Sequence, residues 1–177
     1  LILFIHVTAA WTGAISFITA GFSASFFLKS RRESFSTAMH NAALLGFIFM
    51  ALATVSGAVW AKFAWGAYWN WDIRQTSILL LLLVYAAYFG LRTFSKGARA
   101  LTVSAAYLVY AAMLMPLFVF VIPRLYPTLH PQSIINRQGT IQLETEVRIA
   151  LGLSLAAATL LFITLMKIMS LRNNRLK

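Results

Sequence analysis

Five long apolar runs constrain the fold of this 177-residue chain more than any other feature of its sequence. Each run approaches or exceeds the roughly 20 helical residues that cross the hydrocarbon core of a bilayer. Hydrophobic residues make up 60% of the chain and charged residues 11%, whereas soluble domains have about 45–50% and about 25%. The sequence therefore predicts an all-α, polytopic membrane bundle in a single domain, 1–177. Its five transmembrane helices are expected at about 2–28, 38–61, 76–92, 100–122 and 147–170.

The basic residues predict how these helices are oriented, because loops on the cytoplasmic side of a membrane retain more Lys and Arg. One predicted side carries ten basic residues, and the other carries five. The loop at 62–75 and the connection at 123–146 are therefore expected on the external side, with the C-terminus in the cytoplasm. The ten are Lys29, Arg31, Arg32, Arg92, Lys96, Arg99, Lys167, Arg172, Arg175 and Lys177, and the five are Lys62, Arg74, Arg124, Arg137 and Arg148.

The net charge of +11 follows from this topology and favours contact with anionic membrane lipid. The basic residues form no soluble basic patch, which argues against nucleic acid as a partner. The chain has no cysteine, which excludes disulfides and thiolate metal sites.

Four of the five tryptophans fall between Trp60 and Trp71. Such a dense aromatic patch at a membrane surface predicts a platform for a large, flat, apolar ligand. Two alternatives stay open: tryptophans anchor helices at membrane interfaces, which accounts for Trp60 and Trp11, and aromatic stripes also pack as core. Placed on a helix, four residues at i, i+3, i+4 and i+7 share one face: Trp65, Tyr68, Trp69 and Asp72.

The predicted topology separates the three histidines. His6 and His130 are expected on the external side beside the tryptophans, whereas His40 is expected a membrane thickness away, about 30 Å. Two imidazoles beside a flat aromatic surface are the ligands that six-coordinate haem iron requires. The alternative for each histidine alone is a hydrogen-bonded residue at the membrane interface.

Asp72 is expected to cap the third helix, with Gln75 reaching back to it as in a capping box. Arg74 in the first turn opposes the helix dipole, so it needs a negative partner, either Asp72 or a haem propionate. Other arginines on the same side are candidates for that role or are solvated loop charges: Arg124, Arg137 and Arg148. Pro116 is expected to bend the fourth helix, and Pro123 and Pro127 to stiffen the approach to His130.

Three segments together resemble the WWD family of haem-handling membrane proteins of c-type cytochrome biogenesis. The first is Trp65-Gly66-x-x-Trp69-x-Trp71-Asp72-x-Arg74-x-Thr76. The others are Ile5-His6-Val7-x-Ala9-Ala10-Trp11, which opens one helix, and Thr128-Leu129-His130 in the last external loop. Within that group, the short chain with these two histidine motifs resembles the CcmC, or haem exporter protein C, family. Two positions depart from the family pattern, because Thr8 replaces a common proline and Tyr68 a common tryptophan. The family typically has six helices, so one ahead of residue 1 is expected to be missing.

The resemblance implies that His6 and His130 are axial ligands to the iron of a non-covalently bound haem b. The implied haem contacts are Trp11, Trp65, Tyr68, Trp69, Trp71, Asp72 and Arg74. The implied function is presentation of haem at the outer face of the inner membrane and its transfer to the haem chaperone CcmE, rather than catalysis by this chain. The implied partners are CcmE, the CcmA and CcmB subunits of an ABC transporter complex, the small CcmD, and membrane lipid.

Three other functions are weighed against haem delivery. A haem lyase of the CcmF or CcsA type would attach haem to apocytochrome c, but those proteins are larger and have further transmembrane histidines. A b-type cytochrome subunit for electron transfer would need histidine pairs within its helices, where only His40 is available in the second to fifth runs. A cofactor-free permease is disfavoured because ionisable residues inside the runs are scarce.

Overall fold

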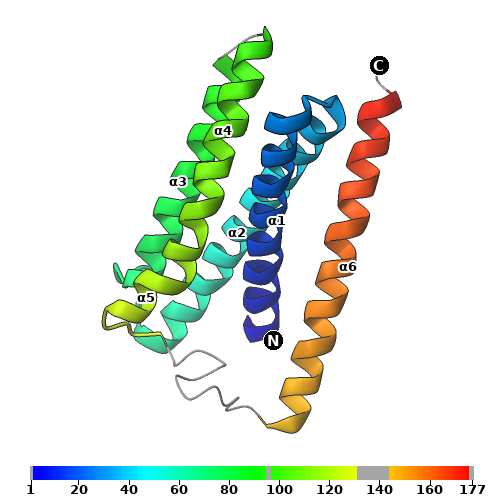
Figure 1. Cartoon of the computed structure of the whole chain (residues 1–177). Helices are drawn as coiled ribbons and strands as arrows, with labels where there is room; N and C mark the ends of the chain where they lie inside the picture. Colours follow the sequence, from blue (N-terminus) through cyan, green and yellow to red (C-terminus); the bar gives the residue numbers. More distant parts are fainter. Residues whose placement is uncertain (1, 95–96, 131–143, 176–177) are drawn as a thin grey trace.

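The computed structural model describes residues 2–94, 97–130 and 144–175, and this part of the chain is almost entirely helical (Figure 1). Five helical stretches are long and apolar enough to cross a membrane, which confirms the predicted polytopic all-α bundle. The elements are α1 (Ile2–Ser30), α2 (Glu33–Trp65), α3 (Ile73–Phe94), α4 (Gly97–Pro116), the π-helical turn η1 (Leu117–Val121), α5 (Ile122–Leu125) and α6 (Thr145–Arg175).

The second helix is longer than predicted, because α2 continues four residues beyond position 61 and ends at Trp65. Gly66 terminates it in the left-handed conformation, with φ 80°, and donates its N–H to the carbonyl of Lys62. Glycine adopts this conformation without the steric cost of a side chain. The connection to α3 therefore comprises only residues 66–72, and the proposed common helix face of Trp65, Tyr68, Trp69 and Asp72 is wrong.

The fourth span is irregular at its end, as the prolines predict. Regular α-helix stops at Pro116, which has no N–H to donate, and a π-helical turn follows it. A short helix, α5, then leads to Tyr126, whose backbone is extended (φ −119°, ψ 153°). The residue before a proline is restricted to this region, and Pro127 follows directly. This turns the chain out of the helix shortly before His130.

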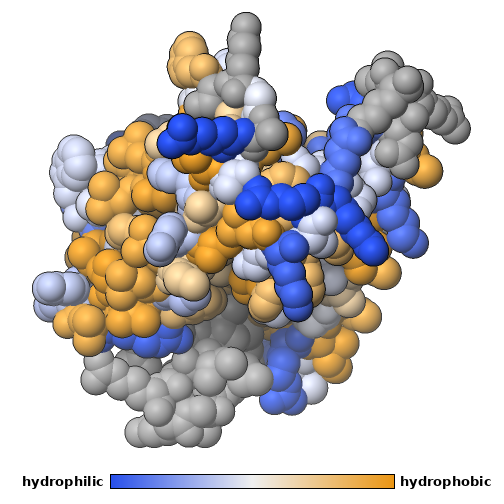
Figure 2. Space-filling view, turned by 45° about the horizontal axis from the view of Figure 1, so that its top comes forward, coloured by the Kyte–Doolittle hydropathy of each residue, from blue (hydrophilic) through white to orange (hydrophobic). Residues whose placement is uncertain are grey.

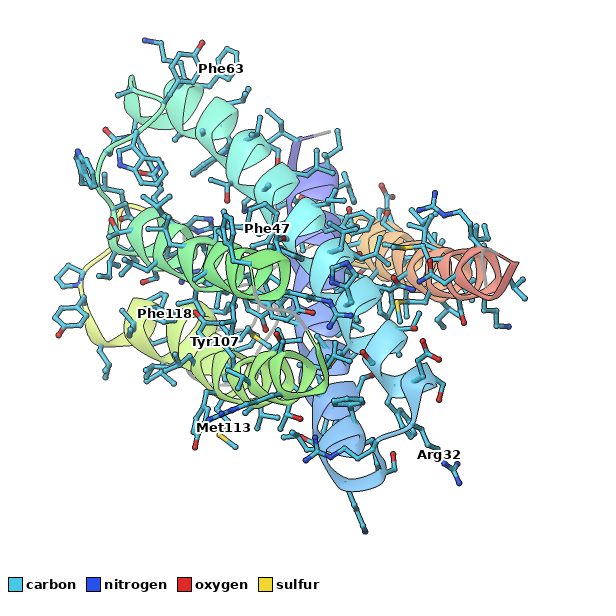
Figure 3. All side chains as sticks on the ribbon, turned by 90° about the horizontal axis from the view of Figure 1, so that it is seen from above. Arg32, Phe47, Phe63, Tyr107, Met113 and Phe118 are labelled. Atoms are coloured by element: carbon cyan, nitrogen blue, oxygen red, sulfur yellow. The ribbon has the colours of Figure 1, made fainter. Side chains whose placement is uncertain are left out.

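Helix α1 lies in the centre of the bundle and contacts α2, α4 and α6. Viewed from above, α6 stands on one side of α1 and α2, whereas α3 and α4 stand on the other (Figure 3). The Tyr107 hydroxyl joins α4 to α3 by donating to the carbonyl of Val84, at 2.9 Å. In the core, the ring of Phe17 stacks on that of Tyr85 with 3.5 Å between centroids. The largest fully buried apolar side chains are Phe17, Met39, Met50, Leu81, Tyr85, Tyr88, Leu108 and Met115.

The two ends of the bundle differ in chemistry. One end, here called the tryptophan end, carries the start of α1, the end of α2, residues 66–72 and the end of α5. It lies at the bottom of Figure 1. The opposite end, here called the basic end, carries the α1–α2 connection, the end of α3, the start of α4 and most of the basic residues in the described part of the chain. His6 and His130 lie at the tryptophan end, whereas the side of the membrane that each end faces stays a prediction.

Close packing of α1 on α2 generates a stability prediction. A methyl group at Gly46 would overlap the ring of Phe17, whereas at Gly90 it would enter open space. We expect Gly46→Ala to destabilise the bundle by about 1–3 kcal/mol and Gly90→Ala to leave it unchanged or stabilise it by up to about 1 kcal/mol. Thermal unfolding in detergent, followed by circular dichroism, measures both. Equal unfolding temperatures for the two variants would contradict the described packing.

Candidate functional site

His6 is held against α2 by its own ring. Its Nδ1 lies 2.8 Å from the carbonyl oxygen of Ala53 and 3.4 Å from the hydroxyl of Ser56. A carbonyl only accepts hydrogen bonds, so Nδ1 carries the proton of the neutral ring and Nε2 retains its lone pair. The contact requires glycine at position 57, because an added Cβ would lie 2.8 Å from Cε1 of the ring. Helix α2 therefore fixes both the orientation and the tautomer of His6.

His130 approaches His6 from the segment that follows α5. The centroids of the two imidazole rings lie 6.4 Å apart, with 34° between their planes. Trp60 lies 5.5 Å from His130 and Trp65 lies 6.4 Å from it, centroid to centroid. The two indoles also contact each other edge to face, at 4.9 Å. We call these four residues, His6, His130, Trp60 and Trp65, the ring cluster.

The buried carboxylate of Asp72 holds the His130 segment in place. One oxygen accepts the N–H of Arg74 at 2.9 Å, which caps α3 as predicted. The Thr128 hydroxyl lies 2.9 Å from both oxygens and donates to them, and the N–H of Leu129 donates to one of them at 2.7 Å. The same hydroxyl accepts the N–H of His130 at 3.2 Å. Asp72 is 7% exposed, and such charge-assisted bonds are stronger than neutral ones.

Gln75 differs from its expected role in the cap. Its side-chain oxygen accepts the N–H of Asn70 at 2.9 Å, and its amide donates to the carbonyl of Tyr68. The expectation that it bonds back to Asp72 is therefore wrong. The backbone of Trp71, just before Asp72, is left-handed with φ 54°. Gln75 instead stabilises the loop of residues 66–72 through bonds to its backbone.

The remaining aromatic residues of the loop form an outer group. Trp69 and Trp71 pair edge to face at 5.8 Å, and Trp71 is 73% exposed. Tyr68 is also exposed, and the ammonium of Lys62 lies 5.7 Å from its ring centroid. Of the tryptophans expected in the platform, the structure brings Trp65 against His130 and leaves Trp69 and Trp71 against each other.

Trp11 and His40 lie apart from the ring cluster. Trp11 follows His6 by five residues, about 140° around α1, and its indole N–H donates to the Thr159 hydroxyl of α6 at 3.1 Å. The Trp11 side chain thus contacts α6, and its expected haem contact stays a prediction. The Nδ1 of His40 lies 3.3 Å from the hydroxyl of Tyr88. His40 precedes Gly57, which contacts His6, by 17 residues along α2, a distance of about 25 Å. The predicted separation of His40 from the other histidines is confirmed.

The arginines of the tryptophan end are divided between elements. Arg74 is half-buried in the first turn of α3, where the charges of Asp72 and Arg124 both act on it. Arg124 donates to the carbonyl of Phe120 at 2.8 Å and lies over its ring. Arg148 is in the first turn of α6, and Arg137 lies outside the described residues. Asp72 thus supplies Arg74 with the negative neighbour expected for it.

Sequence reasoning missed Trp60 and Gly57 as parts of the site. In the sequence, interfacial anchoring accounts for Trp60, and Gly57 belongs to no motif. A signal existed: Ala53, Gly57 and Trp60 follow at i, i+4 and i+7, so they share one face of α2. Thr128 belongs to the Thr128-Leu129-His130 motif, but no local pattern predicts its bond to Asp72, because that bond joins residues 56 positions apart.

Comparison with known proteins identifies the family. A sequence model described as CcmC, heme exporter protein C, matches residues 1–177. The chain belongs to the haem exporter protein C family. "Heme exporter protein C" of Bradyrhizobium diazoefficiens is 32% identical over 177 residues, which cover 99% of this chain and 66% of that protein.

Two other relatives of this haem exporter protein C family chain match shorter stretches. A "Putative cytochrome c biosynthesis ccmC-like mitochondrial protein" of Marchantia polymorpha is 30% identical over 139 residues, or 78% of this chain and 58% of that protein. "Cytochrome c biogenesis protein CcsA" of Prochlorococcus marinus is 43% identical over 68 residues, or 38% and 21%. The chain thus spans about two thirds or less of the length of these relatives.

The Asp72 contacts generate a prediction about the order of the His130 segment. Asn is as good an N-cap as Asp, so Asp72→Asn keeps the start of α3 but removes the charge that Thr128 and Leu129 bond. We expect hydrogen exchange at the Leu129 and His130 amides to rise about tenfold or more, because a bond to a charged group contributes about 1.5–3 kcal/mol. Exchange mass spectrometry measures it, and Thr128→Val should act likewise. Thr159→Val, which removes the Trp11 bond, is the control. Unchanged exchange in both test variants would show that Asp72 does not hold this segment.

Proposed function

We propose that the tryptophan end binds haem, with His6 and His130 as the axial ligands to iron. The observation that carries this proposal is the 6.4 Å between the ring centroids. Imidazole–metal bonds are about 2 Å long, so a metal bound to one nitrogen of each ring separates the centroids by roughly 6–6.5 Å. The two rings are thus already spaced for a metal between them.

The surroundings of His6 support its role as a metal ligand. Metal-binding histidines usually donate their second ring N–H to a carbonyl or carboxylate, which fixes the tautomer and orients the ring. The bond from Nδ1 to Ala53 is of this kind and leaves Nε2 as the ligand atom. Among the described residues no group of three or more His, Cys, Asp or Glu gathers, and the rest of the sequence contains none of these residue types. Haem suits such a pair, because it brings four nitrogen ligands of its own.

The aromatic residues supply the apolar surface that a porphyrin needs. Trp60 and Trp65 lie against His130 and would cover the part of the macrocycle nearest the iron. Tyr68 and Trp71 are largely exposed, and with Trp69 they would provide further apolar surface for the macrocycle. Burial of apolar surface contributes about 25 cal/mol per Å². Because a flat tetrapyrrole has a large apolar area, its total contribution to binding is large. Arg74, Arg124 and Arg148 are the candidates to bond the propionates.

We propose that the cellular role is haem delivery in cytochrome c maturation. Membership of the haem exporter protein C family and relatives named for cytochrome c biogenesis support this role. In the proposed scheme the tryptophan end faces the exterior of the inner membrane, and non-covalent haem b passes from it to the chaperone CcmE. CcmA, CcmB and CcmD are the proposed partners. His6 lies on α1 and its ring bonds to α2, whereas His130 lies outside the helices, in a segment that Thr128 and Leu129 tie to Asp72. We propose that His130 is the ligand that moves when haem is released.

The histidine assignment predicts a spectroscopic result. The purified chain with added haem is expected to show the Soret and α/β bands of low-spin, six-coordinate iron. His6→Ala and His130→Ala should each remove one strong-field ligand and convert the spectrum to a high-spin form. His40→Ala is the matched control, because His40 lies at the basic end, and it should retain the low-spin spectrum. Unchanged spectra in both His6→Ala and His130→Ala would refute the ligand assignment.

A haem lyase is the second candidate function. It is supported by the 43% identity with CcsA over 68 residues. The recipient of the haem distinguishes the two roles. Co-expression of the complete protein with CcmE and an apocytochrome c, followed by haem staining of denatured proteins, detects covalent adducts on either one. We expect an adduct on CcmE that is lost with His130→Ala. An adduct formed on apocytochrome c in the absence of CcmE would establish the lyase function instead.

A further inference from the structure

A cavity at the basic end has no part in the proposed haem site. It has a volume of about 460 Å³ and lies where the last turn of α1 meets the first turns of α2 and α4. Cavities of this size accommodate small ligands. Figure 2, which turns this end forward, shows hydrophilic side chains gathered beside hydrophobic ones. The lining residues share this mixed character: Phe27, Arg31, Glu33, Ser36, Arg99, Leu101 and Thr102.

Arg31, which lines this cavity, has an unfavourable backbone conformation. Its φ is 58°, and its N–H closes the end of α1 by donating to the carbonyl of Phe27 at 2.8 Å. Glycine is the usual residue at such a position, and a side chain there points to a function for that side chain. Its guanidinium donates to the hydroxyl of Thr102 on α4 and lies 5.9 Å from the centroid of Phe27. A strained backbone thus places a cation across the α1–α4 junction.

Further positive charge surrounds the cavity. Arg99 lines it from the first turn of α4. Arg92 of α3 donates to the hydroxyl of Ser36, another lining residue, at 3.5 Å, and its buried Nη1 has no hydrogen-bond partner among the described residues. The first turn of α2 has no side-chain cap. Helix N-termini favour anions, and two of them, those of α2 and α4, border the cavity.

The charges and the apolar lining together define the ligand. Two arginines and two helix N-termini outweigh the one acidic residue in the lining, Glu33, so an anion is favoured. Phe27 and Leu101 require an apolar portion beside that anion. The cavity lies at the ends of membrane-spanning helices, where lipid headgroups are concentrated, and basic pockets between such helices bind anionic headgroups. We propose that this cavity binds the phosphate of an anionic phospholipid, with the start of its acyl chains over Phe27 and Leu101.

The test measures lipid binding to the full chain in detergent by native mass spectrometry. The probes are phosphatidylglycerol, phosphatidylcholine and inorganic phosphate. Arg31→Gly suits the test because glycine accepts the left-handed backbone without strain, so the variant should fold. Arg99→Gln removes the second cation. Arg32→Gln is the matched control, since Arg32 points away from the bundle (Figure 3) and does not line the cavity.

We expect the wild-type chain to bind phosphatidylglycerol in preference to phosphatidylcholine. Arg31→Gly and Arg99→Gln should each weaken this binding about tenfold, whereas Arg32→Gln should leave it nearly unchanged and Glu33→Gln should strengthen it. Equal binding by Arg31→Gly, Arg99→Gln and the wild type would overturn the site. An equal loss of phosphatidylglycerol binding in Arg32→Gln would show that general surface charge, and not this cavity, attracts the lipid. Displacement of the lipid by millimolar inorganic phosphate alone would assign the cavity to free phosphate and overturn the lipid. None of these outcomes depends on haem binding.

Discussion

The tryptophan end depends on one buried anion, the carboxylate of Asp72. It caps α3 through Arg74 and receives hydrogen bonds from Thr128 and Leu129, far along the chain. A buried charge is costly unless it is paired or hydrogen-bonded, and the bonds that satisfy Asp72 join the start of α3 to the segment that carries His130. Two consequences follow. The loop of residues 66–72 has a defined exit into α3, and His130 comes to lie opposite His6.

Much of this arrangement was predictable from local patterns. The five apolar runs predicted the membrane spans because hydrophobic length alone decides spanning, and the distribution of basic residues placed His6 and His130 at one end. The Asp72 cap followed from its position before α3. The end of α2 was not predicted from hydropathy, because hydropathy falls at Lys62. The helix continues to Trp65 and stops where Gly66 adopts the left-handed conformation. The bond of Asp72 to Thr128 has no local signature, since it joins residues that only the folded bundle brings together.

The two ends of the bundle carry complementary chemistry on a shared scaffold. Helix α2 contributes to both: Ser36 in its first turns lines the basic cavity, and Gly57 and Trp60 near its other end contact the histidines. In the proposed account, the basic end is anchored to anionic lipid and the aromatic end presents haem to an acceptor. His6 lies on α1 and its ring bonds to α2, whereas His130 lies in a segment outside the helices that is bonded to Asp72. In the proposed account, this asymmetry would let one ligand leave while the other retains the haem.

In the proposed site, His6 and His130 bind one iron between them at the tryptophan end. A structure of the complete protein with bound haem, determined by electron cryomicroscopy, tests this most directly. We expect iron bonded to Nε2 of His6 and to the ring of His130, with the porphyrin against Trp60 and Trp65 and the Asp72–Thr128 bonds intact. Haem bound away from this pair, or iron bonded to neither histidine, would contradict it.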